Sequence, residues 1–397
     1  MEGGRMLEGL RALDLTDRKG YLCGKILCDL GVDVIKVERP RAIRDVFFIA
    51  YNTGKRCITL DIEKREGREI LLSLIGSADF LIESFDPGYL DSLGVGYEHL
   101  RRRKEALIMT SITPFGQTGP YSSYKASDLT IMAMAGFLYL TGQKDGKPVN
   151  VSIPQSYLLG GADGAVGTLI AYHWRKRTGR GQHVDVSLQQ SVAWFLGTLF
   201  PHFELEGTIL RRMGPFRYGS ENIQRQLWPC KDGYVVFFML GGLQGAKTLR
   251  GLVQWMDEEG HGDEFLSGLE WERFDMLHAP QELIDRVSQP IYEFFKEKTK
   301  KEIMAEAVKR GISVCPVNGV GDLLSDPHLE ERGFWVYVED PELGISIPYP
   351  SHFAKFSVPP MKRRQRAPMV GEDNIDVYGE LGLSKKEIEE LSKEGVL

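Results

Sequence analysis

The cysteine and histidine residues of this sequence limit the chemistry that it can support. The five cysteines are scattered, and none has the Cys-x-x-Cys or Cys/His spacing of a metal site. We therefore expect neither a disulfide framework nor a structural zinc, and we expect reduced, mostly buried thiols. No other metal ligands are expected. Chemistry in this chain must then come from acidic, basic and hydroxyl side chains.

A turn after the first predicted strand is the earliest candidate site. The apolar run Leu10–Leu15 predicts a buried strand, Tyr21–Leu30 a helix and Val32–Val37 a second strand. This unit begins a doubly wound parallel sheet, which binds ligands at the carboxyl ends of its strands. The turn Thr16-Asp17-Arg18-Lys19-Gly20 lies at such an end. It lacks the G-x-G-x-x-G pattern, so NAD is not expected there.

Asp128 is a candidate acidic residue near a later strand end. The segment Leu107–Ile112 predicts a strand, and a Gly/Pro-rich loop separates it from a helix that begins at about Ser127. Asp128 then lies in the first turn of that helix, where the helix dipole favours a carboxylate. A role limited to helix capping is the alternative to a role in a site.

The long Gly/Ala-rich segment in the middle of the chain predicts a buried helix. Apolar residues fill nearly every turn from about Ser156 to Trp174, and the glycines allow close approach of a neighbouring backbone. Gly179 and Gly181 end the helix, His183–Leu188 predicts a strand, and Leu188–Leu199 predicts another helix. We therefore expect another element of the structure to pack closely on this central helix.

Length and composition bound the class of protein. The chain has 397 residues, 42% of them hydrophobic and 26% charged, which suits two domains with cores of their own. No segment reaches the ~18 apolar residues of a membrane span, and the start lacks the apolar region of a signal peptide. The net charge of -6 argues against nucleic-acid and anionic-membrane partners. We expect a cytoplasmic protein with neither partner.

Three sequence motifs resemble those of the class III CoA-transferases, which include formyl-CoA and carnitinyl-CoA transferases and α-methylacyl-CoA racemase. The motifs are T-G-R-G-Q joined to V-D-V-S-L, V-I-K-V-E-R-P, and N-x-x-K-R-x-I-T-L-D. The resemblance implies an α/β fold with a doubly wound, Rossmann-like large domain and a smaller α+β domain. It also implies that two chains form an interlocked dimer.

The resemblance further implies how the chain is divided. Residues 1–200 would form the first part of the large CoA-binding domain, 201–226 a linker, 227–330 the small domain, 331–358 a return linker and 359–397 the rest of the large domain. The segment Gly241–Gly245 is similar to a glycine-rich loop that shields the reaction intermediate in the family. A simple strand-to-helix turn is the alternative reading of that segment.

Coenzyme A or an acyl-CoA is the substrate that the resemblance implies, with no tightly bound cofactor. Its phosphate groups require several Arg and Lys donors, and its adenine lies beside the turn after the strand Ala78–Glu83. Ser84 replaces the asparagine of the family in this turn, and Phe85 could instead be a core aromatic. The candidate CoA-binding residues are Arg18, Lys19, Arg39, Lys55, Arg56, Ser84, Phe85 and Lys125.

The catalytic residue that the resemblance predicts is absent. In the family an aspartate at the start of the central helix attacks the acyl-CoA thioester, but positions 156 and 157 hold Ser156 and Tyr157. Neither side chain can form a mixed anhydride. Asp163 is the nearest acid, ~10 Å further along the helix. It is either a displaced nucleophile or a buried, hydrogen-bonded acid or part of a subunit contact.

These residues predict a CoA-transferase subunit that moves CoA between two carboxylic acids. The resemblance places Asp128 in the active site, and racemases of the family carry a histidine where this chain has Ser127, which cannot act as a base. We expect a homodimer, or a heterodimer with an aspartate-bearing paralogue as found in two-subunit members of the family. The alternatives are an acyl-CoA racemase or isomerase, and a non-catalytic acyl-CoA-binding subunit.

Overall fold

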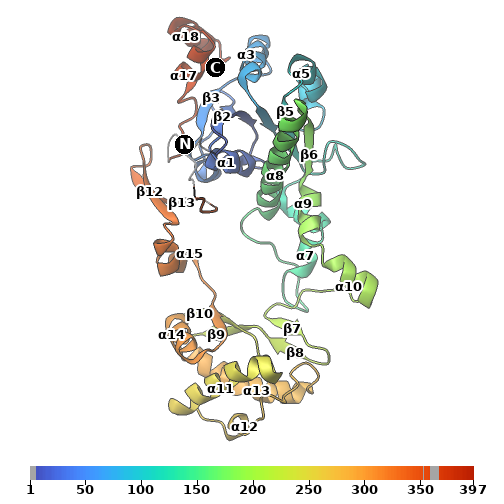
Figure 1. The fold of residues 1–397 in the computed structure, drawn as a ribbon, viewed down its shortest axis with the longest axis vertical. Coiled ribbons are helices and arrows are strands. Elements are labelled where there is room, and N and C mark those ends of the chain that lie inside the picture. Colours follow the sequence, from blue (N-terminus) through green and yellow to red (C-terminus); the bar gives the residue numbers. More distant parts are fainter. Residues whose placement is uncertain (1–5, 352, 358–365) are drawn as a thin grey trace. The chain divides into compact units, whose positions relative to one another are not determined.

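The computed structural model describes residues 6–351, 353–357 and 366–397, and it divides into two compact units (Figure 1). The large unit comprises Met1–Tyr139, Asn150–Leu210 and Glu331–Leu397, and the small unit comprises Leu140–Val149 and Arg211–Glu330. No helix within the described ranges is both long and apolar enough to cross a membrane.

A parallel sheet of six strands forms the centre of the large unit. Its strands are β1 (Arg11–Leu15), β2 (Asp33–Glu38), β3 (Arg56–Thr59), β4 (Phe80–Glu83), β5 (Ile108–Thr113) and β6 (His183–Ser187). Their spatial order is β3-β2-β1-β4-β5-β6, with every neighbouring pair parallel. This is the strand order of a doubly wound dinucleotide-binding sheet, and it agrees with the predicted fold class.

Helices cover both faces of this sheet because successive strand residues point to opposite sides. In β1, Ala12 joins the core on one face and Leu13 the core on the other. The first face carries α1 (Tyr21–Asp29), α6 (Asp128–Met134), α8 (Gln155–Thr178) and α9 (Leu188–Phe195). The second carries α3 (Arg65–Ser77), α4 (Tyr89–Ser92), α5 (Tyr97–Arg103), α17 (Asn374–Glu380) and α18 (Lys385–Lys393). The remaining helices of this unit include α2 (Val46–Tyr51), α7 (Phe137–Leu140) and α10 (Leu199–Glu206).

The central helix α8 packs closely on α1. A Cβ atom added at Gly161 would lie 2.8 Å from Cβ of Leu22, and one added at Gly160 would lie 2.1 Å from Cδ2 of Leu188. The glycines therefore permit the tight packing that the sequence predicted. The helix ends at Gly179, whose φ of 75° is the left-handed conformation that glycine adopts most easily.

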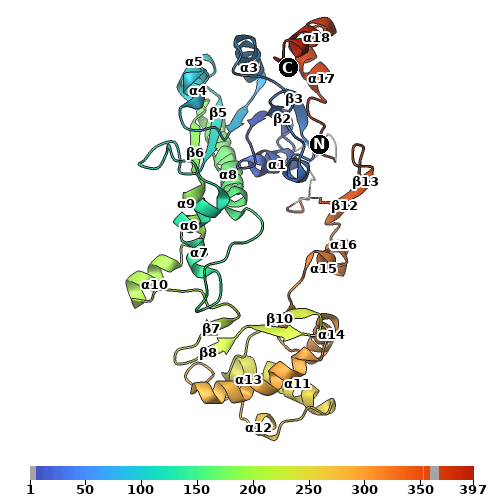
Figure 2. The same ribbon diagram turned by 180° about the vertical axis from the view of Figure 1, so that it is seen from behind.

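The last part of the chain completes the edge of the sheet beside β3 (Figure 2). The Asp373 carboxylate accepts a hydrogen bond from the backbone N–H of Cys57 at 2.8 Å, and Asn374 Oδ1 accepts one from that of Thr59 at 2.9 Å. The hydroxyl of Tyr378 donates to the Thr59 carbonyl. Side chains of the tail thus satisfy backbone groups that an edge strand would leave unpaired.

The small unit has a three-stranded antiparallel sheet, ordered β11-β10-β9, packed against helices. The strands are β9 (Leu227–Cys230), β10 (Gly233–Phe237) and β11 (Val314–Pro316). The packed helices are α11 (Gly242–Glu258), α12 (Glu264–Ser267), α13 (Gln281–Lys296) and α14 (Lys300–Arg310), while α15 (Val320–Leu324) and α16 (Pro327–Glu331) follow β11. A separate hairpin joins β7 (Phe216–Tyr218) and β8 (Ile223–Arg225). Trp228, Phe237 and Phe295 pack edge to face in the core.

Several segments differ from the expectation. The expected linker 201–226 contains most of α10 and the hairpin β7–β8, and the expected return linker 331–358 contains the hairpin β12–β13 (Trp335–Asp340 and Ile345–Pro350). The helix expected over Leu188–Leu199 ends at Phe195, shortly before Gly197. Part of the expected boundary near 358 falls on residues 358–365, which lie outside the described residues.

Candidate active site

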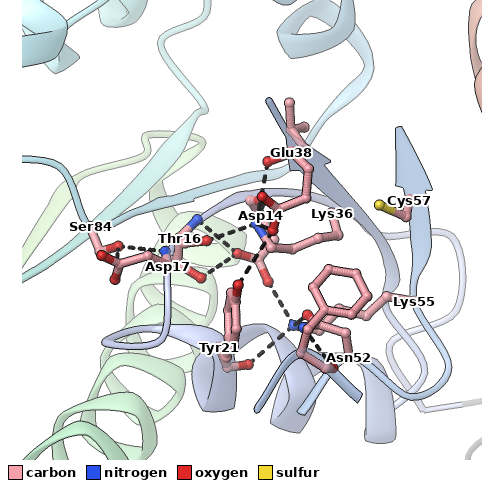
Figure 3. Close-up of polar contacts among 12 residues, drawn as sticks. Asp14, Thr16, Asp17, Tyr21, Lys36, Glu38, Asn52, Lys55, Cys57 and Ser84 are labelled. Carbon is pink, nitrogen blue, oxygen red and sulfur yellow. Dashed lines mark hydrogen bonds and ion pairs between the residues drawn. The ribbon is translucent and has the colours of Figure 1, made fainter. Parts of the chain in front are cut away.

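A buried charged network fixes the turn after β1 (Figure 3). One oxygen of Asp14 accepts hydrogen bonds from the backbone N–H and the hydroxyl of Thr16, at 3.0 and 2.6 Å. The other lies 2.7 Å from Nζ of Lys55, and both side chains are fully buried. Burial alone would raise the pKa of Asp14, but the charges of Lys55 and Lys36 outweigh it and hold the pKa below its usual value.

Lys36 extends this network to the start of the turn. Its ammonium group donates to the Thr16 carbonyl at 2.7 Å and to the Asp14 carbonyl at 3.1 Å, and it forms an ion pair with Glu38. Burial would lower the pKa of Lys36, but the carboxylates of Glu38 and Asp14 raise it overall. The turn is therefore held by groups that are charged near neutral pH.

Lys55 and Arg56, two of the predicted CoA-binding residues, are enclosed by acceptor groups of the chain itself. Besides Asp14, Lys55 donates to Asn52 Oδ1 and to the Tyr21 carbonyl, at 2.7 and 3.1 Å. The guanidinium of Arg56 is buried between the carboxylates of Asp33 and Glu380. Both cations are enclosed and paired with carboxylates, as structural cations are, and their contact with CoA stays a prediction.

The remaining candidate CoA-binding side chains gather at the carboxyl edge of the sheet. The Ser84 hydroxyl accepts from the backbone N–H of Asp17 and donates to its carboxylate, at 2.8 and 2.9 Å, which ties the turn after β4 to the turn after β1. The ring of Phe85 packs on that of Tyr89, with centroids 4.9 Å apart. The Tyr89 hydroxyl accepts a long hydrogen bond from Arg39.

Four basic side chains of this edge reach solvent. Arg39 pairs with Glu63 at 3.1 Å and Lys125 with Asp86 at 3.5 Å. Arg18 pairs with Asp45, and Lys19, the least exposed of the four, pairs with Asp17. Exposed ion pairs of this kind contribute little to stability and can exchange their partner for a phosphate group. A role of these four side chains in CoA binding stays a prediction.

The position expected for the nucleophile is occupied by a serine that is hydrogen-bonded to Asp128. Ser156 lies fully buried in the first turn of α8, and its backbone N–H and hydroxyl donate to the same oxygen of Asp128 at 2.9 and 2.7 Å. The backbone N–H of Asp128 donates in turn to the Tyr157 hydroxyl at 3.2 Å. Asp128 thus joins the first turns of α6 and α8, beyond simple capping of its own helix.

This cluster lies near the turn after β1. Burial raises the pKa of the Tyr157 hydroxyl, and the charges of Asp17 and Arg18 also act on it. The turn after β1 converges with the turn after β4 at Ser84, and the helix that follows it, α1, packs on α8. What the convergence lacks is a carboxylate at position 156 or 157.

Asp163, the nearest acid along the helix, is not buried in this chain. Its side chain is exposed on α8, about two turns beyond Ser156, and no hydrogen bond to it is found within the described part of the chain. The expectation of a buried, hydrogen-bonded acid is therefore wrong for this chain. The reason is geometric, because Asp163 precedes Val166 and Ile170 by three and seven residues and so shares their exposed side of α8.

One polar cluster at the sheet edge was not predicted. Glu83 at the end of β4 accepts hydrogen bonds from the backbone N–H of Phe85 and from Ser111, and the Ser111 hydroxyl lies 2.8 Å from Nε2 of His183. These side chains line a cavity of about 380 Å³. Burial raises the pKa of Glu83 to about 7. The position of Glu83 at the end of a predicted strand was the feature of the sequence that could have indicated this cluster.

Comparison with known proteins agrees with this geometry. The sequence model of CoA-transferase family III matches residues 7–374. The chain is 34% identical to the subunit BbsE of succinyl-CoA:(R)-benzylsuccinate CoA-transferase from Thauera aromatica, over 99% of this chain and 98% of that one. It is 27% identical to the beta subunit of succinyl-CoA–L-malate CoA-transferase from Chloroflexus aurantiacus, over 98% of each chain.

A solved structure supports the same assignment. The crystal structure of a CaiB/BaiF family protein from Brucella suis superposes with a TM-score of 0.81 and 28% sequence identity, covering 96% of this chain and 100% of that one. The chain therefore belongs to CoA-transferase family III, whose CoA-transferases move coenzyme A between carboxylic acids.

Proposed function

We propose that this chain is the non-nucleophilic subunit of a heteromeric CoA-transferase and needs an aspartate-bearing paralogue for activity. The observation that carries the proposal is Ser156, whose hydroxyl is committed to Asp128 at the position where the family requires a carboxylate. The two relatives described above are themselves named as subunits. An interlocked dimer would place two such chains in one enzyme.

The chemistry explains why a serine cannot substitute. In the family reaction a carboxylate attacks the thioester carbon and expels the CoA thiolate, which leaves a mixed anhydride. The thiolate then attacks the aspartyl carbonyl, which releases the first acid and leaves an aspartyl thioester. The acceptor acid and CoA exchange through a second anhydride. A serine ester would lack the reactivity of an anhydride and would trap the acyl group.

In this proposal the chain supplies binding and positioning. Arg18, Lys19, Arg39 and Lys125 would meet the phosphates of CoA, and Phe85 would lie beside the adenine. The relatives act on succinate, benzylsuccinate and malate, as their names state, and all three are dicarboxylic acids. We therefore propose dicarboxylic acids as the substrate class.

Co-expression with an aspartate-bearing paralogue tests the partner. We expect the purified complex to exchange CoA between succinyl-CoA and a dicarboxylic acid, and this chain alone to have no activity, as measured by chromatography of the CoA esters. Replacing the paralogue's aspartate with asparagine should abolish the exchange, while Asp163→Asn in this chain should leave it unchanged. An active homodimer of this chain that Asp163→Asn inactivates would refute the proposal.

A further inference from the structure

The hairpin β7–β8 presents an arginine to a cavity in the small unit. Arg217 lies opposite Gln224 in the hairpin, so both side chains emerge on the same face. Arg217 lines a cavity of about 520 Å³, together with the turn Gly241-Gly242 that begins α11. A volume of this size falls in the range of small-molecule sites.

Of the two arginines that line this cavity, Arg217 is the one for which the described residues provide no acidic partner. Glu272 pairs with Arg250, which lies outside the lining. Arg273 pairs with Glu270 at 3.0 Å, and Asp275 pairs with His278 at 2.9 Å. Arg217 is therefore the basic side chain of this lining that no described carboxylate occupies.

The guanidinium of Arg217 is held in place by neutral acceptors. Its Nε and Nη2 both donate to Oε1 of Gln224, at 3.1 and 2.6 Å, and Nη2 also donates to the Met239 carbonyl at 3.3 Å. Gln224 is itself buried, and its amide donates to Oδ1 of Asn222 at 3.0 Å and to the Met276 carbonyl at 2.7 Å. The buried amides therefore orient the arginine without neutralising it.

The contrast with Arg56 shows what is missing at Arg217. Arg56 is a structural arginine, and two carboxylates meet its guanidinium. At Arg217 no described acceptor engages Nη1, and partial burial lowers the pKa of the group, since nothing nearby offsets its desolvation. An oriented, partly desolvated guanidinium with free donors is the usual receptor for a planar anion.

We propose that this cavity binds a carboxylate group through Arg217. The class of ligand is a small organic acid, whose carboxylate would accept from the N–H groups that remain free on Arg217. The inference rests on the proposed function and deepens it, because it assigns a site in this chain that recognises the free carboxylate of a dicarboxylic substrate. Asn222 and Gln224 are then positioning residues.

Titration calorimetry on the purified full chain tests the site directly. Succinate is the probe, succinamide is its neutral counterpart of similar shape, and inorganic phosphate is a competing anion. We expect succinate to bind and succinamide not to bind, because only the first carries a carboxylate. Arg217→Gln should weaken succinate binding about tenfold or more, since charge-assisted hydrogen bonds would be lost.

Two further variants sharpen the result. Arg217→Lys keeps the charge but loses the planar fork, so we expect intermediate weakening even if Arg217→Gln folds poorly. Arg273→Gln removes an arginine that lines the same cavity but is paired, and it should bind succinate as the unchanged chain does. Thermal unfolding of each variant shows whether the fold is retained.

The outcomes separate the possibilities. Equal succinate affinity in the unchanged chain and in Arg217→Lys or Arg217→Gln would overturn the proposal. So would binding of succinamide, or phosphate binding as tight as that of succinate, which would indicate an unspecific anion site. Because no turnover is measured, the result does not depend on a partner subunit, and it can fail while partner-dependent activity is still found.

Discussion

The folded protein disfavours the ionised form of the Glu83 carboxyl group. It lies buried at the end of β4, and burial outweighs the hydrogen bonds from Ser111 and from the Phe85 backbone and the nearby charge of Lys19. The charge of Asp185 raises the pKa further, to about 7 in all. The turn that carries Phe85 is therefore held by a carboxyl that changes charge near neutral pH.

The stability of the chain should reflect this group. The folded protein holds the Glu83 proton up to about pH 7, whereas the unfolded chain loses it near 4.5. Stability from this group therefore falls as pH rises from about 4.5 to 7, by roughly 3 kcal/mol in all. In Glu83→Gln we expect this part of the pH dependence of the unfolding free energy to vanish, as measured by urea unfolding at several pH values. Glu63→Gln, at an exposed position, is the control and should keep it; a slope unchanged in Glu83→Gln would contradict the assignment.

For single residues, the sequence predicted the location of the candidate side chains more accurately than their roles. Arg39 and Lys125 lie at the predicted sheet edge because they follow strand ends or precede a helix there. The role of Lys55 could not be predicted, since it depends on Asp14, which is 41 residues away in the sequence and meets it only in the folded core. The absence of a carboxylate at position 156 could be read from the sequence, but the hydrogen bond between Ser156 and Asp128 could not.

Close packing of α8 on α1 is the element-scale feature with the clearest test. A methyl group at Gly161 would meet Cβ of Leu22 at 2.8 Å and the backbone N of Cys23 at 3.3 Å, so α1 would have to move. At Gly76, near the end of α3, the same addition meets nothing within 4 Å. The two glycines therefore differ in environment, although both are helical.

We expect Gly161→Ala to destabilise the chain by about 1–3 kcal/mol, the usual cost of overpacking. Gly76→Ala should instead stabilise it by up to ~1 kcal/mol, because alanine favours helix. Chemical denaturation of both variants measures the difference. Equal effects at the two positions would show that the helices are not packed as closely as described.

The elements that the sequence missed have physical explanations. The apolar side chains of α10 are exposed, so its sequence has no buried face to reveal a helix. The strands β7 and β8 have three residues each, too few for a period to be recognised. The hairpin β12–β13 could have been predicted, since the segments W-V-Y-V-E-D and I-S-I-P-Y-P flank a short turn. Its place in the sequence between the two units favoured the interpretation as a linker.

At the scale of the whole molecule, one chain leaves part of its central helix uncovered. Val166, Ile170 and Trp174 follow one another at helical spacing on α8 and are 57%, 64% and 52% exposed. Apolar stripes of this kind mark surfaces that another chain covers. The stripe on α8 supports the proposed interlocked assembly, whether the partner is an identical chain or a paralogue.

Substitution within this stripe tests the assembly. Ile170→Glu should weaken association with the second chain, because a charge would be buried without a partner. Lys176→Glu lies on a different side of α8 and serves as the control. Analytical ultracentrifugation reports the mass of each assembly. Association of Ile170→Glu as strong as that of the unchanged chain would exclude this stripe from the interface.

The pairing of β3 with the tail sets an order of events during synthesis. Cys57 and Asp373 are 316 residues apart in the sequence, and the whole small unit is encoded between them. At the usual rate of translation the ribosome needs roughly 15–60 s to pass from one to the other. Throughout that interval the edge of the sheet has no cover. The small unit is therefore made before the large one can close, and in the proposed interlocked assembly this interval would be the time in which a partner chain is threaded.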